Sequence, residues 1–320
     1  MAVFTQVSDV ELCEFIQQYE KNIGEFIKLE GISGGIENTN YFLYTAKSTY
    51  VLTIFERLTF SQLPFYLELM SNLADKGICV PKPIQDINGN IINTLCSKPC
   101  TIVTKLDGVS IFSPTIDNIK DLAINVATMH IVSQEFTLKQ KNLRSLDWWK
   151  ETIPAIIPFI NKKTADILQA ELEFQENFFN SAIYKSLPKG ACHCDLFRDN
   201  ALFSNNKLSG IFDFYFAGVD TFLFDICVII NDWCIYRDED NLGSINLDLY
   251  HAFIDSYQTV RRLTDNELYS INSMLRAAAL RFWISRLWDW HLPRDSKLLK
   301  PHDPCHFEII LSKRIKQQIN

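Results

Sequence analysis

Residues 193–200 read HCDLFRDN, and residues 213–215 read DFY. In this pattern Asp195 is followed five positions later by Asn200, and Asp213 comes after a short apolar stretch. An Asp can accept the proton of an acceptor hydroxyl, while an Asn and a second Asp supply the hard oxygen ligands that Mg²⁺ takes beside nucleotide phosphates. Such chemistry depends on positioning and charge neutralisation rather than on a protein nucleophile. The spacing therefore indicates a phosphoryl-transfer site, with Asp195 as catalytic base and Asn200 and Asp213 as metal ligands.

The sequence around these residues strengthens that interpretation. His193 stands two positions before Asp195, as in the H-x-D opening of kinase catalytic loops. Residues 201–203 and 208–212 are largely apolar, and the polar segment SNNK separates them, which predicts a hairpin of two short strands. Such a hairpin would return the chain to its starting point, as a shared metal ion requires. An acidic turn before a hairpin without any ligand is the alternative.

Composition and charge limit the classes of protein to which this chain can belong. Its 320 residues suit one or two domains with a substantial core. A content of 47% hydrophobic and 22% charged residues is ordinary for a soluble globular protein. The 38 acidic residues exceed the 31 basic ones, and the net charge of −7 disfavours binding to nucleic acid or to an anionic membrane.

Cysteine usage and hydrophobic segments indicate a location. Nine cysteines, an odd number without paired spacing, predict free thiols in a reducing compartment. Cys192 and Cys194 are expected to be buried thiols rather than metal ligands. The N-terminus has no basic segment followed by an apolar stretch, so no secretory signal is predicted. The best candidate for a membrane span, residues 222–236, is short and interrupted by acidic residues. We therefore expect a soluble, cytoplasmic protein.

The order of the predicted elements indicates two lobes. Strand-like segments prevail up to residue 106, apart from a first helix after Ser8 and an amphipathic helix at residues 63–76, and six long helices follow. Ser8 and Glu11 predict a capping box at the start of the first helix, whose apolar face is expected to consist of Val10, Leu12, Phe15 and Ile16. Strands first and helices afterwards favour an α+β fold. We expect a nucleotide-binding lobe at residues 1–106 with a hinge near 103–106, and a catalytic and substrate-binding lobe at residues 107–320. The nucleotide would lie in the cleft between them.

The nucleotide-binding residues are expected in the N-terminal lobe. Residues 31–40 read GISGGIENTN, and small residues and amides of this kind allow main-chain N–H groups to approach phosphates. An ordinary turn is the alternative. The candidate residues from this loop, the third strand and the hinge are Gly34, Gly35, Asn38, Asn40, Thr53, Val103 and Leu106.

Taken together, these motifs resemble those of a known family. The chain is similar to the aminoglycoside-phosphotransferase and choline-kinase family, which has a two-lobed protein-kinase-like fold. Within that family it looks like the bacterial homoserine kinases. The resemblance covers nearly the whole chain. The segments that carry it are residues 1–3, 7–8, 31–41, 50–56, 63–66, 193–197, 213–217, 225, 231–234 and 276–282.

The resemblance implies an activity as well as a fold. It implies phosphoryl transfer from ATP, with Mg²⁺, to the side-chain hydroxyl of L-homoserine, a step in threonine synthesis. One departure from the wider pattern is Thr53, which stands where many kinase-like enzymes carry a Lys that holds the phosphates. Homoserine kinases of this type share the feature, so it does not indicate an inactive protein. The cation that holds the phosphates stays open, with Arg57 and Lys47 as candidates.

The long helix predicted at residues 265–292 carries the candidates for binding the acceptor. Arg281 and Arg286 lie in an apolar sequence, where a buried guanidinium needs a partner. An amino acid offers a carboxylate to one of them, and an ammonium to an acidic side chain such as Asp225. Internal ion pairs are the alternative for the arginines, and bracing of the catalytic loop is the alternative for Asp225.

Two other functions fit parts of the pattern. A kinase of another small hydroxyl compound, such as an aminoglycoside, choline or a sugar, would carry the same core motif. A catalytically silent nucleotide-binding regulator would fit the neutral Thr53, although the intact acidic motif argues against it. As partners we expect ATP and L-homoserine, with neither nucleic acid nor membrane, and either a monomer or a weak homodimer.

Overall fold

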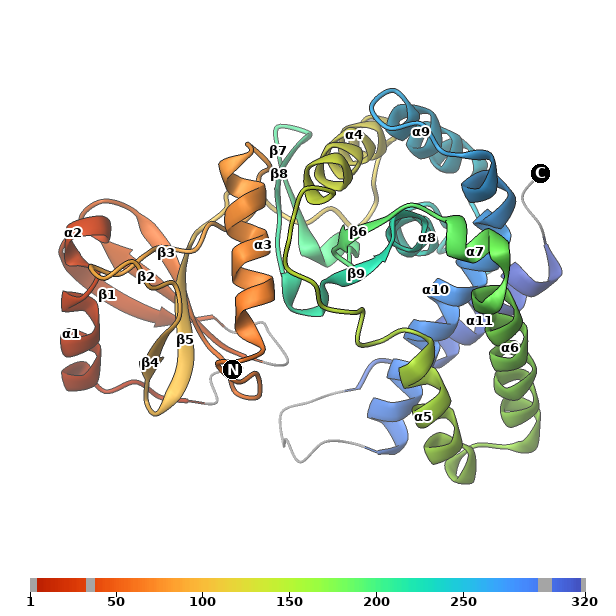
Figure 1. Ribbon diagram of the computed structural model, residues 1–320, viewed down its shortest axis with the longest axis horizontal. Helices are drawn as coiled ribbons and strands as arrows, with labels where there is room; N and C mark the ends of the chain where they lie inside the picture. Colours follow the sequence, from red (N-terminus) through yellow and green to blue (C-terminus); the bar gives the residue numbers. More distant parts are fainter. Residues whose placement is uncertain (1–4, 33–37, 293–300, 318–320) are drawn as a thin grey trace. The chain divides into compact units, whose positions relative to one another are not determined.

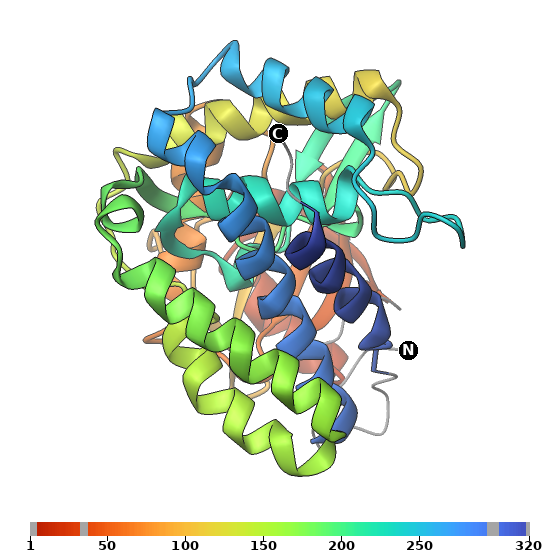
Figure 2. The ribbon, with the colours of Figure 1, turned by 90° about the vertical axis from the view of Figure 1, so that its right-hand side faces the viewer.

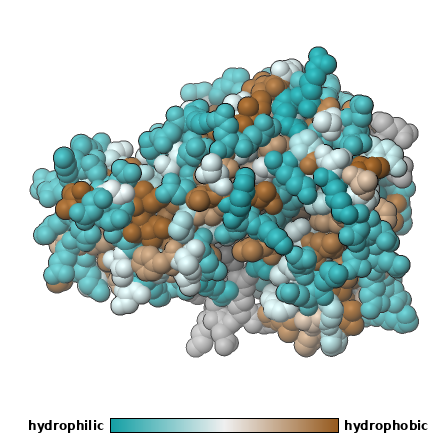
Figure 3. Space-filling model, viewed as in Figure 1, coloured by the Kyte–Doolittle hydropathy of each residue, from teal (hydrophilic) through white to brown (hydrophobic). Residues whose placement is uncertain are grey.

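The computed structural model describes residues 5–32, 38–292 and 301–317. The chain folds as two compact units, residues 1–107 and residues 108–320. The smaller unit is built on a five-stranded sheet, and the larger one consists mainly of helices (Figure 1). Hydrophilic side chains cover most of the face seen in Figure 3, with smaller apolar patches among them. Within the described ranges, no helix combines the length and the apolar character needed to cross a membrane.

An antiparallel sheet forms the framework of the smaller unit, with the strand order β1-β2-β3-β5-β4. The strands are β1 (Phe26–Gly31), β2 (Thr39–Thr45), β3 (Thr49–Ile54), β4 (Asn93–Leu95) and β5 (Lys98–Thr104). Buried and half-buried residues alternate along β2, as expected of a strand with one face on a core. In the register of β2 and β3, Asn40 lies opposite Thr53. The strand-like segments predicted in this region are confirmed, and β2 and β3 form a hairpin.

Helices complete the smaller unit. They are α1 (Asp9–Gln17), α2 (Glu20–Ile23) and α3 (Leu63–Asp75). α1 begins with the predicted capping box, in which Ser8 and Glu11 satisfy each other's main-chain N–H groups. Leu12 and Ile16 of α1 pack into the core against the strands. Val10, which we expected on the same apolar face, is 71% exposed. Two positions along a helix turn a side chain to the opposite side, which explains the difference.

The larger unit contains the long helices. Its α-helices among the described residues are α4 (Ile116–Ser133), α5 (Leu146–Ile156), α6 (Lys162–Asn180), α7 (Ala182–Ser186), α8 (Phe222–Trp233), α9 (Leu247–Gln258), α10 (Asp265–His291) and α11 (Cys305–Lys316). Every residue of α8 is buried, as expected of a helix that is apolar on all sides. α10 packs against α8, α11 and the helices α5 to α7, and Figure 2 shows it beside the α5–α6 pair.

The six long helices predicted after residue 107 are confirmed, with different ends. The helix predicted at residues 146–160 ends at Ile156 and continues as a short 3₁₀ turn. Pro158 lies in that turn, and a proline ring disfavours continuation of the α-helix by the residue before it. α11 was not predicted from the sequence. In the structure Pro304 is the N-cap of α11.

Candidate active site

Two small antiparallel sheets carry the motif at residues 193–215. β6 (Lys189–Cys192) pairs with β9 (Gly218–Thr221), and β7 (Ala201–Ser204) pairs with β8 (Lys207–Ile211). At the end of the β7–β8 hairpin opposite its turn, the N–H of Phe212 donates to the carbonyl of Asn200 at 3.0 Å. This hydrogen bond brings Asp213 next to Asn200, as the spacing of the hairpin predicts.

Asn200 is also tied to the loop that carries Asp195. Its side chain is buried, and its Nδ2 donates to the main-chain oxygen of Asp195 at 2.8 Å. The amide nitrogen is thereby used inside the loop, which leaves the amide oxygen as the atom able to face a hard cation. Asp195 is half-buried and Asp213 is exposed. The loop and the hairpin thus bring the three predicted residues into one small region.

Two residues of the motif have left-handed backbone conformations. Cys194 has φ 63°, and Asp213 has φ 65° and ψ 58°. For residues that carry a Cβ atom this conformation costs about 1–2 kcal/mol each. It persists only where the surroundings hold it. Cys194 directly precedes Asp195, and Asp213 is itself acidic. The two left-handed conformations therefore set the directions of the Asp195 and Asp213 side chains.

His193 links the two acidic segments. Its ring is fully buried; Nε2 donates to the carbonyl of Phe212 at 2.9 Å, and Nδ1 accepts from the N–H of Asp195 at 3.3 Å. Burial lowers the pKa of His193, so the ring stays neutral near pH 7 and acts as donor on one side and acceptor on the other. Both ring nitrogens are therefore engaged in hydrogen bonds that support the loop.

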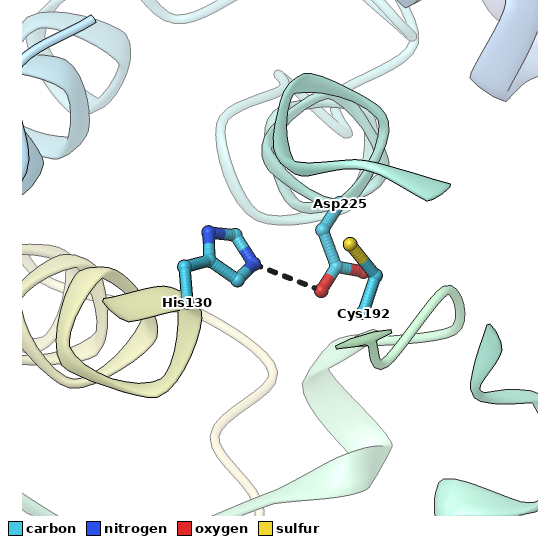
Figure 4. A group of neighbouring side chains, drawn as sticks. All are labelled: His130, Cys192 and Asp225. Carbon is cyan, nitrogen blue, oxygen red and sulfur yellow. Dashed lines mark hydrogen bonds and ion pairs between the residues drawn. The ribbon is translucent and has the colours of Figure 1, made fainter. Parts of the chain in front are cut away.

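Asp225 of α8 binds the main chain of the same loop. It is completely buried, and its carboxylate accepts from the N–H groups of His193 at 2.9 Å and Cys194 at 2.7 Å. A third hydrogen bond, 3.1 Å long, joins it to Nε2 of His130 on α4 (Figure 4). Burial alone would raise the pKa of Asp225, but these hydrogen bonds and the neighbouring histidines outweigh it and lower the pKa. The contacts fit the bracing of the catalytic loop, the alternative role that the sequence leaves open.

The contacts of Asp225 extend into a chain of buried polar groups. Nδ1 of His130 lies 2.8 Å from the hydroxyl of Tyr257, which also accepts from Nη1 of Arg261 at 3.1 Å. Nη2 of Arg261 donates to Glu267 at 2.9 Å, and Glu267 completes the capping box at the start of α10. This series of polar contacts therefore connects α4, α8, α9 and α10 with the loop at residues 193–200.

Within this network, His130, Cys192 and Asp225 form a group that resembles a metal ligand set. Their ligand atoms lie within 4.8 Å of one another (Figure 4). However, burial raises the pKa of Cys192 well above its usual value, so the thiol stays protonated. It donates to the carbonyls of Asp220 and Thr221. The atoms that would bind a metal ion already make hydrogen bonds. Cys192 is the buried thiol that the sequence predicts.

A second carboxylate fixes the end of the loop that lies before Asn200. Oδ2 of Asp232 accepts from the N–H of Arg198 at 2.9 Å and from its Nε at 3.1 Å. Oδ1 accepts from Nη2 of Arg237 at 2.7 Å. The loop from 193 to 200 is therefore bound at both ends by acidic side chains of α8.

The two arginines predicted to bind an acceptor have different surroundings. Arg281 is 4% exposed, and its Nη2 lies 3.5 Å from Oδ1 of Asp195. Arg286 stacks over the ring of Phe307 at 4.5 Å, and Nη1 reaches a main-chain carbonyl in the segment before α11. Burial lowers the pKa of Arg286 to about 10. The rings of Phe282 and Phe307, 5.2 Å apart, lie between the two guanidinium groups. Of the two, Arg281 is the one beside Asp195.

One further arginine was missed by the sequence analysis. Arg144 lies just before α5, and its guanidinium carbon is 4.6 Å from the ring centre of Trp148 and 5.9 Å from that of Phe216. Phe216 belongs to the 3₁₀ turn Phe214–Phe216 that follows Asp213. The same ring lies 5.3 Å from the guanidinium carbon of Arg281. An arginine close to a pair of tryptophans was the only local signal, because its distance from the motif along the chain hides the contact.

In the smaller unit, some of the predicted nucleotide residues are in contact. The Thr53 hydroxyl donates to Oδ1 of Asn40 at 2.8 Å across β2 and β3. Asn38 and Val103 are buried, and Leu106 is half-buried beyond the end of β5. Gly34 and Gly35 lie outside the described residues.

The candidates for a phosphate-binding cation in the smaller unit differ in their contacts. The ammonium of Lys47 donates to the carbonyls of Lys21 and Asn22 at 3.1 and 3.2 Å, near the end of α2. Cations often bind the last carbonyls of a helix in this way. Arg57 is exposed. The contacts of Lys47 are those of a structural residue.

Comparisons with known proteins agree on a family. The model of the family described as "Phosphotransferase enzyme family" matches residues 28–263. Homoserine kinase of Polaromonas naphthalenivorans is 48% identical over 315 residues, which are 98% of each chain. Homoserine kinase of Ralstonia nicotianae is 49% identical over 328 residues, covering 99% of this chain and 97% of the relative.

Among solved structures, amicoumacin kinase hAmiN in complex with AMP-PNP, Ca²⁺ and Ami superposes with a TM-score of 0.70. The match covers 97% of this chain and 95% of the other at 17% identity, a level at which it shows a shared fold. The expected two-lobed, protein-kinase-like fold is thereby confirmed.

Proposed function

Because the chain belongs to the phosphotransferase enzyme family, and within it to the homoserine kinases, we propose that it phosphorylates the side-chain hydroxyl of L-homoserine with ATP. The product would be O-phospho-L-homoserine, an intermediate of threonine synthesis. The observation that carries the proposal is the set of contacts among Asp195, Asn200 and the segment before Asp213, which gathers a base and two oxygen ligands. Arg281 beside Asp195 supports an acceptor that carries a carboxylate.

The donor set fits a magnesium ion that accompanies the nucleotide. Asn200 and Asp213 offer an amide oxygen and a carboxylate, both hard ligands, and the Phe212–Asn200 hydrogen bond brings them side by side. Bound there, Mg²⁺ would neutralise charge on the phosphates. The left-handed backbone at Asp213 supports the role, because strained residues of this kind concentrate at functional sites.

Asp195 is proposed as the base that receives the proton of the acceptor hydroxyl. As the hydroxyl oxygen bonds to the γ-phosphorus, the bond to the β-phosphate oxygen breaks, ADP leaves and the hydroxyl proton passes to the Asp195 carboxylate. The main chain of this residue is held by His193 and by the carbonyl contact to Asn200. Support of this kind keeps the Asp195 carboxylate in the geometry that phosphoryl transfer requires.

For the acceptor, we assign the carboxylate of homoserine to Arg281. A guanidinium presents paired N–H donors that match a carboxylate, and this one lies within 3.5 Å of the base. Arg286, stacked on Phe307, has surroundings that support a structural role at α11. Asp225 is proposed as the residue that braces the loop rather than as a ligand of the ammonium, because its oxygens already accept three hydrogen bonds.

ATP is proposed to bind the smaller unit through β2, β3 and the segment after β5. The Asn40–Thr53 hydrogen bond supports a shared role for these two side chains, in place of the lysine found in many kinase-like enzymes. Asn38, Val103 and Leu106 remain candidates, as do Gly34 and Gly35. We also propose a cytoplasmic enzyme that acts as a monomer or weak homodimer; the free thiols among the described residues support a reducing compartment.

A screen of acceptors tests the proposed function. The purified protein is incubated with ATP and Mg²⁺ and with homoserine, choline, a hexose or an aminoglycoside in parallel, and ADP release is followed. We expect ADP release above background with homoserine, and a phosphorylated amino acid as product by mass spectrometry. Turnover with choline, the hexose or the aminoglycoside but not with homoserine would show that homoserine is not the acceptor. Failure with all four, while ATP still binds, would favour a silent regulator.

A further inference from the structure

Arg144 and Arg281 come from distant parts of the chain and share one aromatic ring beside the candidate base. Their guanidinium carbons lie 5.9 and 5.3 Å from the centre of the Phe216 ring. Each guanidinium carbon also lies over a ring of its own, Trp148 for Arg144 at 4.6 Å and Phe282 for Arg281 at 3.8 Å. Planar groups therefore alternate from the start of α5 to α10.

The aromatic rings decide which part of each guanidinium can bind a ligand. A guanidinium that rests with its face on an aromatic ring keeps its five N–H donors in the plane at its edge. That edge matches the two oxygens of a carboxylate in a two-pronged geometry. Two such groups on one ring favour an anion near both of them, since the anion offsets the repulsion between the positive charges.

The position of Arg144 is fixed by its own segment. Asn142 accepts from the N–H of Arg144 at 2.9 Å, and its Nδ2 donates to the buried Asp220 on β9 at 2.7 Å. The carbonyl of Arg144 accepts from the indole N–H of Trp149 at 2.7 Å. The chain also packs directly on β9, because a Cβ atom at Gly218 would meet the Asn142 main chain at 2.7 Å. The segment is thus built against the strand that continues from Asp213.

From these contacts we infer that Arg144 is a further substrate-binding residue, which acts with Arg281 to bind the acceptor's carboxylate beside Phe216. The inference rests on the proposed function and adds to it the means of selection. A pair of guanidinium groups favours a small alcohol with a carboxylate and disfavours a polycation or a neutral sugar. Arg281, next to Asp195, lies close to the reacting hydroxyl, while Arg144 contacts the acceptor farther from it.

The test compares two acceptors that differ only in the carboxylate. L-Homoserine and 3-aminopropan-1-ol share the hydroxyl, the carbon spacing and the ammonium. For Arg144→Met, we expect kcat/KM with homoserine to fall by roughly 10- to 100-fold, the usual effect of losing a charge-assisted hydrogen bond. The fall with 3-aminopropan-1-ol should be much smaller. The loss should lie mainly in KM, because the residue is remote from the transferred group.

A matched control and a conservative variant make the result decisive. Lys141→Met removes an exposed positive charge from the same segment, and should leave the kinetics with both acceptors near those of the wild type. Arg144→Lys keeps the charge and loses the planar edge, so it should fall between wild type and Arg144→Met. Thermal melting and ATP binding report whether each variant is folded, and Arg144→Lys carries the test if Arg144→Met does not fold.

Equal losses with the two acceptors, or no loss with homoserine, would overturn the role of Arg144. In that case normal turnover of homoserine by the wild type would leave the proposed function intact. If the wild type does not phosphorylate homoserine, the proposed function fails first and this inference fails with it.

Discussion

Nε2 of His193 donates a hydrogen bond of 2.9 Å to the carbonyl of Phe212, and this contact joins the loop that carries Asp195 to the end of the strand before Asp213. His193 stands two positions before Asp195, and Phe212 one position before Asp213. Because the ring is buried and its pKa is lowered, the contact does not depend on protonation near neutral pH. This neutral hydrogen bond therefore joins the two halves of the candidate site, together with the main-chain bond between Phe212 and Asn200.

Asp195→Asn should remove catalysis and keep the fold. The amide is of the same size as the carboxylate but cannot accept the hydroxyl proton, so kcat should fall by roughly two to four orders of magnitude. Steady-state kinetics and a thermal melt of the purified variant measure both effects. Turnover close to that of the wild type in a folded Asp195→Asn protein would remove this residue from the role of base.

Asp213→Asn should separate metal binding from nucleotide binding. Asparagine tolerates the left-handed backbone found at this position, so the fold should persist where other substitutions would add strain. We expect a strong loss of affinity for Mg²⁺–ATP and a small one for metal-free ATP. Calorimetric titrations with and without Mg²⁺ make the comparison, and equal losses in both would argue against direct ligation.

Asp225→Ala should destabilise the larger unit as well as the loop. It leaves the N–H groups of His193 and Cys194 and the ring of His130 without their buried acceptor. Breaking a buried charged contact of this kind costs about 3–5 kcal/mol. Urea unfolding gives the free energy, with Asp225→Asn as the milder variant because it keeps one acceptor oxygen. A change below about 1 kcal/mol for Asp225→Ala, the usual net value of one hydrogen bond, would contradict the bracing role.

His306 should make the stability depend on pH. Burial, together with the positive charges of Arg286 and Arg237, lowers its pKa to about 4. In the unfolded chain the pKa is near 6.5, so between these values the unfolded state binds a proton that the folded state does not. Stability from this group is therefore present above pH 6.5 and lost as the pH falls towards 4. As the pH is lowered from 7.5 to 4.5, the melting temperature of the wild type should fall relative to that of His306→Gln. Parallel pH profiles would show that His306 is not responsible.

Gly218→Ala should disturb the support of Arg144. Its Cβ would lie 2.7 Å from Cα and 2.8 Å from N of Asn142, both main-chain atoms that cannot rotate away. The segment or β9 must shift, and overpacking of this kind typically costs about 1–3 kcal/mol. We expect a lower melting temperature and a raised KM for homoserine. A variant with wild-type stability and KM would show that the segment adapts without moving Arg144.

The sequence predicts those parts of the site that depend on local spacing. Asn200 and Asp213 come together because a hairpin of short strands has few possible geometries, and turn residues mark its ends. The long helices and the capping box of α1 follow in the same way from periodicity and from residues with local roles. A mostly apolar span, as in α8, predicts that the helix is buried. It does not predict which of its carboxylates supports the loop at residues 193–200.

The remaining parts depend on tertiary packing, which spacing does not encode. The left-handed conformation of Cys194 is imposed by contacts to α8, and no residue preference marks it. Arg144 and Arg281 meet at Phe216 only because three separate elements converge there. For the same reason, the sequence could not separate Arg281 from Arg286, two arginines on one helix whose neighbours differ.

The alternation of rings and guanidinium groups from Trp148 to Phe282 has an evolutionary consequence. The hydrogen bonds that support Asp195 and Asp213 come from the loop, the hairpin, α4 and α8, whereas the guanidinium groups come from the segment before α5 and from α10. Substitutions at Arg144 can alter which alcohol is accepted while the hydrogen bonds of the first set stay in place, whereas Arg281 contacts Asp195 itself. An ancestor with this arrangement can diversify its acceptors by substitutions in the segment before α5, while selection on phosphoryl transfer keeps the loop, the hairpin and Arg281 unchanged.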